Sequence, residues 1–315
     1  MSHSTNAVAV LARTRWGIEA ARCLAQSDIP IRLVATARAE SFYNCGEAEY
    51  AELARDTGAM FVNVSTTSSD DLSAAIRECK CALAISVNWP TVLNSEFIGH
   101  FSLGILNAHA GDLPRYRGNA CPNWAILNGE SRIGLCVHFM EPDALDSGPV
   151  VLRDGLCIGA KTYIGDVYDW LDQCIPKLLR EAVLGVLRKT VTPIPQQNEQ
   201  SLALRCYPRR PEDGRIDWNA PAEIVHRLIR ATSHPFAGAF AFLENGRRVT
   251  IWRASVFNHP GSFCAVPGQF MARVGGCPVV ACGEGCLLIE DVTVDGGDRQ
   301  NDLSDLSKSL RARLI

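Results

Sequence analysis

The first half of the chain alternates short apolar runs with stretches of helical periodicity. The apolar runs lie at residues 7–11, 30–35, 60–64, 82–87 and 102–106. Runs of this length, rich in Val, Ile, Leu and Ala, are typical of parallel strands that are buried on both faces. The intervening residues 18–26, 48–57 and 70–79 fit helices. This order predicts an α/β fold with a doubly wound, mainly parallel sheet.

The remainder of the chain changes its pattern after residue 191. Before that point, helices are expected at residues 120–127 and 166–187, with a strand at 134–140. The polar stretch 192–204 reads as a linker that few contacts should cross, between a catalytic domain at 1–191 and a second domain at 205–315. In that second domain a helix is expected at 221–230, short strands at 249–254, 269–274, 278–281 and 287–294, and a last helix at 303–314. Strands of this kind predict a small antiparallel, barrel-like sheet.

Composition and charge narrow the classes of protein. Of the 315 residues, 47% are hydrophobic and 21% charged, with a formal net charge of −3, as in ordinary soluble domains. Without an extended Lys/Arg block, no nucleic-acid partner is expected. We expect no secretory signal, and no apolar window approaches about 18 residues. We therefore expect no membrane partner and a cytoplasmic protein.

Two common cofactor motifs are missing from the sequence. The loop at residues 12–17 lacks Gly-x-Gly-x-x-Gly, which gives no support to a dinucleotide cradle of that kind. The thirteen cysteines include no Cys-x-x-Cys pair. We therefore expect buried thiols and no metal site.

Asn107 and His109 stand at the carboxyl end of the run at 102–106, where open α/β sheets place their ligands. Two residues apart on an extended backbone, their side chains point to the same side. A carboxamide N–H can stabilise an oxyanion, and an imidazole can take up and return a proton near neutral pH. Together they suit acyl transfer to a nitrogen nucleophile, although Asn-x-His is also compatible with a turn-forming Asn and a packed His.

A carboxylate beside the imidazole would orient it and raise its pKa. Asp146, in a loop after the strand at 134–140, is the candidate for this position. Asp112 and Asp143 are rival carboxylates, of which Asp143 should be solvated. His138 lies on the preceding strand and is expected to be a packed residue outside the site.

The order of these motifs resembles a known family. The chain contains, in this order, a strand, Asn107-x-His109, the loop Leu113-Pro114-Arg115-Tyr116-Arg117-Gly118, a helix, a strand and Leu145-Asp146-Ser147-Gly148-Pro149. This arrangement is similar to that of the formyltransferases that use 10-formyltetrahydrofolate as co-substrate. The family includes methionyl-tRNA formyltransferase, glycinamide ribonucleotide transformylase and the sugar N-formyltransferases. The resemblance matches its catalytic Asn, His and Asp to Asn107, His109 and Asp146.

The same resemblance implies which residues contact the folate. These are Thr91, Val92 and Leu93 after one strand, together with Asn119, Pro142, Asp143, Ala144 and Leu145. Val92 and Leu93 could equally be core residues at the start of a helix. Family resemblance also suggests a homodimer.

The second domain favours the sugar branch of the family. Ile216-Asp217-Trp218 and Arg230-Ala231 resemble the signature of the C-terminal barrel that tRNA and nucleotide-sugar formyltransferases share. The flanking Pro211-Glu212-Asp213-Gly214 and the segment from His234 to Phe240 look most like the formyltransferase that acts on UDP-4-amino-4-deoxy-arabinose. Asn119 departs from the Arg of that pattern, and Asp146 follows its strand after one extra residue, so the particular sugar stays open.

Several functions are compatible with these residues. The first is formyl transfer from 10-formyltetrahydrofolate to the amine of a nucleotide-linked amino sugar. The second is formylation of methionyl-tRNA, for which the chain offers no Lys/Arg-rich insertion near Arg38. Hydrolysis of the formyl donor and a folate-binding module without catalysis are further alternatives. Trp16, Trp89, Trp124 and Tyr116 could stack on a base, or could belong to the core.

Overall fold

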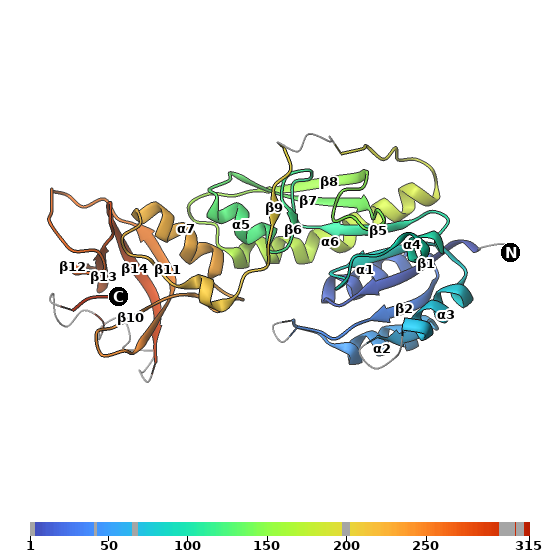
Figure 1. Cartoon of the computed structure of the whole chain (residues 1–315), viewed down its shortest axis with the longest axis horizontal. Coiled ribbons are helices and arrows are strands. Elements are labelled where there is room, and N and C mark those ends of the chain that lie inside the picture. The colour runs from blue at the N-terminus through green and yellow to red at the C-terminus, as the bar shows by residue number, and fades with distance from the viewer. Residues whose placement is uncertain (1–3, 41–42, 65–68, 197–201, 296–305, 307–311) are drawn as a thin grey trace. The chain divides into compact units, whose positions relative to one another are not determined.

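The computed structural model describes residues 4–40, 43–64, 69–196, 202–295, 306 and 312–315. The chain forms two compact units. The first contains residues 1–121, 132–157 and 168–206, and the second contains residues 122–131, 158–167 and 207–315. Figure 1 traces both from the N-terminus to the C-terminus. Among the described residues, no helix combines the length and the apolar character needed to cross a lipid bilayer.

The first unit is built on a seven-stranded sheet with the order β3-β2-β1-β4-β5-β7-β8. Figure 1 labels β2, β1, β5, β7 and β8 of this sheet. Its strands are β1 (Ser4–Ala12), β2 (Ile31–Thr36), β3 (Met60–Asn63), β4 (Cys81–Val87), β5 (Ile105–His109), β7 (Arg132–Phe139) and β8 (Val150–Cys157). The pairs from β3 to β5 are parallel, whereas β7 and β8 are antiparallel to their neighbours. The predicted mainly parallel, doubly wound sheet is confirmed, and β8 is a strand that the sequence pattern did not predict.

Helices connect these strands. They are α1 (Arg15–Ala25), α2 (Glu47–Thr57), α3 (Ser69–Cys79), α4 (Ser95–Gly99), α5 (Cys121–Leu127) and α6 (Ile164–Leu187). β4 is buried along its whole length, as expected for a central parallel strand covered on both faces. A short pair of strands, β6 (Arg117–Gly118) and β9 (Arg205–Cys206), joins the loop after β5 to the end of the unit.

The strand that carries the candidate site starts later than predicted. The pattern placed it at 102–106, but β5 occupies Ile105–His109. Gly104 has a φ of +84° and its N–H donates to the Phe101 carbonyl, so a turn occupies the residues before Ile105. As a result, Asn107 and His109 belong to the strand itself rather than to the loop after it.

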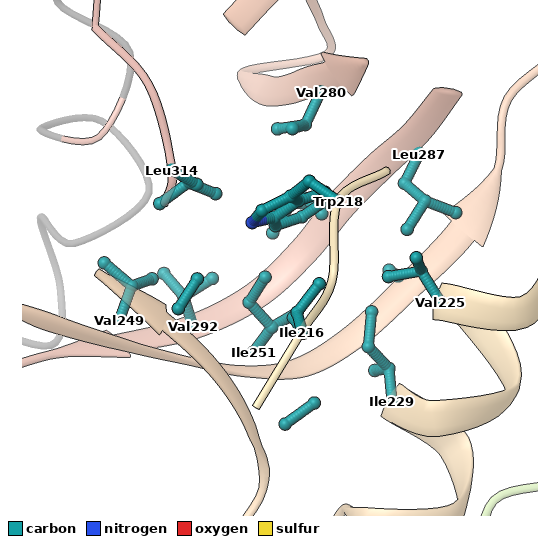
Figure 2. Close-up of a cluster of buried hydrophobic side chains, with 14 of the residues drawn as sticks. Ile216, Trp218, Val225, Ile229, Val249, Ile251, Val280, Leu287, Val292 and Leu314 are labelled. Atoms are coloured by element: carbon teal, nitrogen blue, oxygen red, sulfur yellow. The ribbon is translucent and has the colours of Figure 1, made fainter. Parts of the chain in front are cut away.

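The second unit is an antiparallel sheet closed by a helix. Its elements are η1 (Pro211–Gly214), α7 (Ala222–Thr232), β10 (Ala239–Phe242), β11 (Arg248–Val256), β12 (Phe270–Val274), β13 (Cys277–Ala281) and β14 (Cys286–Val294). The strand order β10-β11-β14-β13-β12 confirms the predicted antiparallel sheet. Figure 2 shows Trp218 within its apolar core, with Ile251, Val280 and Leu314 around the indole. The predicted last helix at 303–314 lies mostly outside the described residues, and Arg313 and Leu314 form strand bridges instead.

Close packing of α1 on β1 depends on Gly17. A Cβ at this position would lie 2.3 Å from the Cβ of Ala12 and 2.6 Å from the hydroxyl of Tyr50. The Tyr50 hydroxyl is itself fixed, because it donates to the Thr14 carbonyl at 2.6 Å. Gly17 therefore lets the first turn of the helix lie against the end of the strand.

We expect Gly17→Ala to lower the free energy of unfolding by about 1–3 kcal/mol, because the added methyl group overpacks this contact. Gly99→Ala, at the end of α4, is the matched control, since a Cβ there meets no atom within 4 Å. Urea denaturation followed by circular dichroism measures both values. Equal stability of the two variants would contradict the packing role of Gly17.

Candidate active site

A row of polar side chains crosses the sheet at Asn107. In the register of the strands, Asn107 of β5 pairs with Ser86 of β4 and with His138 of β7. Paired residues on neighbouring strands project to the same face of a sheet. Ser86 is fully buried, and its hydroxyl has no hydrogen-bond partner among the described residues. The topology thus gathers polar groups from three strands on the face that carries Asn107 and His109.

His138 belongs to this site, and the expectation that it lies outside was wrong. Its Nε2 lies 3.2 Å from Asn107 Nδ2, and its Nδ1 lies 2.7 Å from the Phe139 carbonyl oxygen. Because a carbonyl only accepts, Nδ1 carries a hydrogen, and in the neutral ring Nε2 accepts from the Asn107 amide. A protonated ring would instead donate from Nε2 to Asp146. The amide has two N–H groups, so one remains for a ligand. The strand register that joins His138 to Asn107 links residues 31 positions apart and was not readable from periodicity.

The Asp146 carboxylate lies at the centre of the buried polar groups. The Gly118 N–H donates to Asp146 Oδ2 at 2.9 Å. The same oxygen lies 3.5 Å from His109 Nδ1, while Oδ1 lies 3.5 Å from His138 Nε2. Only 9% of the Asp146 side chain is exposed. The structure therefore brings Asn107, His109 and Asp146 together, with His138 in contact with two of them.

The electrostatics keep Asp146 ionised. Burial by itself would raise the pKa of this carboxyl, but the charge of His109, the hydrogen bond and charge of His138, and the Gly118 N–H outweigh it and lower the pKa to about 2. At neutral pH the site holds a fixed negative charge.

His109 is neutral at rest but placed to hold a proton. Burial lowers the pKa of its imidazole below 6.5, an effect that the neighbouring Asp146 charge opposes. Nε2 donates to the Tyr116 carbonyl oxygen at 2.7 Å, which leaves the lone pair on Nδ1, facing Asp146. Both ring nitrogens therefore face acceptors, an arrangement that fits an imidazolium ion. Gly111 permits this packing, because a Cβ there would lie 2.5 Å from His109 Nε2.

The stretch predicted to be a linker with few contacts supports this loop. Gln196 Nε2 donates to the carbonyl oxygens of Asp146 and Gly148, each at 2.8 Å, and Gln196 Oε1 accepts from Arg117. Ile194 pairs with Val150 at the start of β8. This stretch therefore makes specific contacts with the first unit, because the buried carbonyl groups of the Asp146 loop need donors.

The two segments predicted to contact folate lie side by side. The Asp143 N–H donates to the Leu93 carbonyl oxygen at 3.0 Å. The Leu93 side chain is buried in the apolar core, whereas Val92 is 52% exposed. Thr91, Asn119, Pro142 and Asp143 are exposed, and Ala144 and Leu145 are half-buried. Most residues of the two segments are thus exposed or half-buried. Leu93 is the exception, and only its backbone is available for a contact.

Other candidates from the sequence have separate environments. Asp112 lies 3.5 Å from Arg132 and 3.6 Å from Arg153, and Asp143 is exposed as expected. Of the four aromatic candidates for base stacking, Tyr116 is buried and Trp16, Trp89 and Trp124 are half-buried. The cysteines are free thiols and most are buried; Cys157 and Cys264 are exposed.

Comparison with known proteins identifies the family. Residues 2–183 match the family model "Formyl transferase", and residues 209–307 match "Formyl transferase, C-terminal domain". A methionyl-tRNA formyltransferase from Pelobacter propionicus is 32% identical over 235 residues, which cover 74% of this chain and 70% of the relative.

Solved structures share the fold. An N-formyltransferase from Helicobacter canadensis, in complex with folinic acid and dTDP-3-aminofucose, superposes with a TM-score of 0.64 at 14% identity, covering 91% of this chain and 99% of its own. HypX from Aquifex aeolicus has a TM-score of 0.58 at 18% identity, where 92% of this chain spans 46% of HypX. Because the two family models cover most of the sequence and a relative is 32% identical over 74% of it, the chain belongs to the formyl transferase family and is an N-formyltransferase enzyme.

Proposed function

We propose that the protein transfers the formyl group of 10-formyltetrahydrofolate to the amine of a nucleotide-linked amino sugar. The observation that carries this proposal is the convergence of Asn107, His109 and Asp146 on one face at the end of β5. An amide donor, a neutral imidazole and an ionised carboxylate are the groups that amine formylation needs.

In this mechanism the neutral amine attacks the formyl carbon and an oxyanion forms. The Asn107 N–H that His138 leaves unused stabilises the oxyanion. His109 accepts the amine proton at Nδ1, the ring nitrogen that carries the lone pair. The resulting imidazolium is held between the Tyr116 carbonyl and Asp146, and it returns the proton to the departing nitrogen of the folate.

The folate supplies the formyl group already activated on nitrogen. We assign its binding to the adjoining segments Thr91–Leu93 and Pro142–Leu145, together with Asn119. The fit is supported by the Asp143–Leu93 hydrogen bond, which holds two exposed segments next to each other beside the Asp146 loop. The Helicobacter canadensis structure was solved with folinic acid, a compound of the same class.

An amino sugar is the acceptor that we favour. The Helicobacter canadensis neighbour is a complex with dTDP-3-aminofucose, and the second unit carries the motifs resembling the sugar enzymes. The 32% identity to a methionyl-tRNA formyltransferase makes charged initiator tRNA the second candidate. A homodimer, suggested by family resemblance, stays a prediction.

A direct assay decides between the acceptors. The enzyme is incubated with 10-formyltetrahydrofolate and, in turn, UDP- and dTDP-linked amino sugars, methionyl-tRNA, or no acceptor. We expect a formamido sugar as product, detected by mass spectrometry, and little formate without acceptor. Formylated methionyl-tRNA as the sole product would select the second candidate, and formate release at the full rate without acceptor would identify a hydrolase.

His109→Ala and Asp146→Asn should each lower turnover by at least about a hundredfold, because each removes a group that acts on the transferred proton. Asp112→Asn is the matched control, since Asp112 pairs with arginines instead of an imidazole, and it should retain turnover within about twofold. Circular dichroism checks that all three variants fold. Turnover near the wild-type rate in either test variant would remove the mechanism.

The pH dependence of kcat/KM should show its acid limb below pH 6.5, because burial lowers the pKa of His109. The Asp146 charge raises that pKa, so Asp146→Asn should move the limb to still lower pH. Rate profiles from pH 4.5 to about 9 measure both positions. A shift to higher pH in this variant would contradict the electrostatic role of Asp146.

His138 acts as a positioning residue through Asn107 and Asp146. His138→Ala should lower kcat by about tenfold, the effect of losing one hydrogen bond in the site, while both KM values stay within about twofold. His138→Gln keeps an acceptor for the Asn107 amide and should recover part of the rate. Equal loss in both variants, or a loss confined to KM, would argue against this role.

A further inference from the structure

Two buried thiols lie next to each other beside the site. Cys121 begins α5, Cys206 ends β9, and both belong to the first unit. Cys206 pairs with Gly118 in the parallel ladder of β6 and β9, and its carbonyl accepts from the Asn119 N–H at 3.1 Å. The side chains of the two cysteines are within hydrogen-bond distance of each other. The mechanism above uses neither thiol.

Cys121 also contacts the partner of the candidate base. Its sulfur lies 3.0 Å from the Tyr116 carbonyl oxygen and 3.8 Å from His109 Nε2. The same carbonyl accepts from His109. The single S–H of Cys121 can be donated either to this carbonyl or to the Cys206 sulfur, but not to both at once. A change in the bonding of Cys121 therefore reaches the group that binds the His109 imidazole.

The two thiols differ in acidity. A hydrogen bond from Cys121 lowers the pKa of the Cys206 thiol, and the charge of Arg205 lowers this pKa further, although burial opposes both effects. The same hydrogen bond, together with burial, raises the pKa of the Cys121 thiol. An acidic thiol beside a protonated one is the arrangement of an attacking and a resolving cysteine.

Both side chains are covered by protein, since Cys121 is 2% exposed and Cys206 is 3% exposed. The cover over Cys206 is slight in one respect, because β6 and β9 contain only two residues each. Few ladder hydrogen bonds hold such a pair of strands, so it opens locally at a low cost in free energy. A small uncharged oxidant can reach the sulfur through an opening of this kind.

We propose that Cys121 and Cys206 form a reversible disulfide, and that this bond lowers the turnover of the enzyme when a peroxide oxidises it. The effect on turnover rests on the proposed function, because it acts through His109, whereas the disulfide rests on the contact between the two thiols. Intracellular disulfides of this transient kind usually serve redox sensing.

The chemistry needs one molecule of hydrogen peroxide. The Cys206 thiolate attacks one oxygen, the O–O bond breaks, and the products are a sulfenic acid and a hydroxide that takes up a proton to become water. The Cys121 thiol then attacks the sulfenic sulfur, the S–O bond breaks, and the Cys121 proton leaves with the oxygen as a second water. Two thiols are thereby oxidised to a disulfide, and the peroxide is reduced to two molecules of water.

The disulfide would disturb the loop between β5 and α5. A disulfide brings its sulfur atoms to about 2.05 Å, closer than two thiols joined by a hydrogen bond. The residues just before Cys121 include Tyr116, whose carbonyl binds His109, and Gly118, whose N–H binds Asp146. Because misplacing a reacting group by about 1 Å can lower a rate about a hundredfold, a loop displaced in this way should slow the reaction.

The test starts from the full chain, reduced with dithiothreitol and then treated with hydrogen peroxide. Remaining thiols are blocked with iodoacetamide, and tryptic peptides are analysed by mass spectrometry. We expect a pair of peptides joined through Cys121 and Cys206, and turnover lowered by at least about tenfold. Dithiothreitol should break the link and restore turnover. Oxidation of the exposed Cys157 and Cys264 confirms that the treatment was effective, and absence of the joined peptides would then overturn the disulfide.

Cys206→Ser removes the attacking thiol. In the reduced state its turnover should lie within about twofold of the wild-type value, and peroxide should change it by less than about twofold. Cys79→Ser is the matched control, because Cys79 and Cys81 are a second pair of buried thiols in contact, where α3 meets β4. This control should lose turnover under peroxide as the wild type does. Equal sensitivity of Cys206→Ser would overturn the proposal. Should Cys206→Ser lower the melting temperature markedly, Cys206→Ala decides.

Two separate readouts distinguish this proposal from the proposed function. The mass spectrum reports the disulfide without any acceptor, and turnover is then measured with the acceptor that the enzyme accepts. If methionyl-tRNA proves to be the acceptor and its formylation falls on oxidation, the disulfide stands and the sugar assignment fails. If an amino sugar is formylated and turnover stays within about twofold although the link has formed, the function stands and the regulation fails.

Discussion

The buried carboxylate of Asp146 is the interaction on which the site depends. An ionised carboxylate in a protein interior is costly unless its oxygens are bonded and opposite charge is close by. Here the Gly118 N–H donates to Asp146 Oδ2, ring nitrogens of His109 and His138 lie 3.5 Å from the carboxylate oxygens, where each ring can donate once it is protonated, and Gln196 donates to the Asp146 backbone carbonyl. The contacts of Asp146 therefore connect the loop after β5, the strand β7 and the segment that follows α6.

In the proposed mechanism this arrangement prepares the site for a charge that appears only during the reaction. Burial keeps His109 neutral at rest, while acceptors already face both of its ring nitrogens and can bond the N–H groups of an imidazolium ion. Groups that are already oriented need no reorganisation when charge develops, which is the main electrostatic advantage of an enzyme over water. The hydrogen bond from Asn107 to His138 serves the same end, because it fixes the amide with one N–H unused.

The topology places the strand that carries Asn107 and His109 next to the reversal of strand order. The order reverses between β1 and β4, and β5 is the next strand along from β4. Gly17 allows α1 to lie close against β1, which brings the helix N-terminus to the strand end.

The sequence determined the class of fold and the three candidate residues of the site. The continuous apolar runs of the first unit indicate burial on both faces, so its parallel strands were predictable. The short strands expected in the second unit made its antiparallel sheet predictable. Asn107, His109 and Asp146 were also predictable, because their order along the chain is that of a known family. β8 was missed because most of its residues are exposed or half-buried, and the extent of β5 was missed because a turn at Gly104 interrupts the apolar run.

Only the tertiary structure decided which groups surround the reactive residues. His138 enters the site through the antiparallel register of β5 and β7, and Gln196 enters from a stretch that reads as a linker. The contact between the Cys121 and Cys206 thiols is likewise a property of the three-dimensional fold. The physical reason is common to all of them: a side chain's residue type fixes what it can bond, but the fold alone fixes which partners come within hydrogen-bond distance.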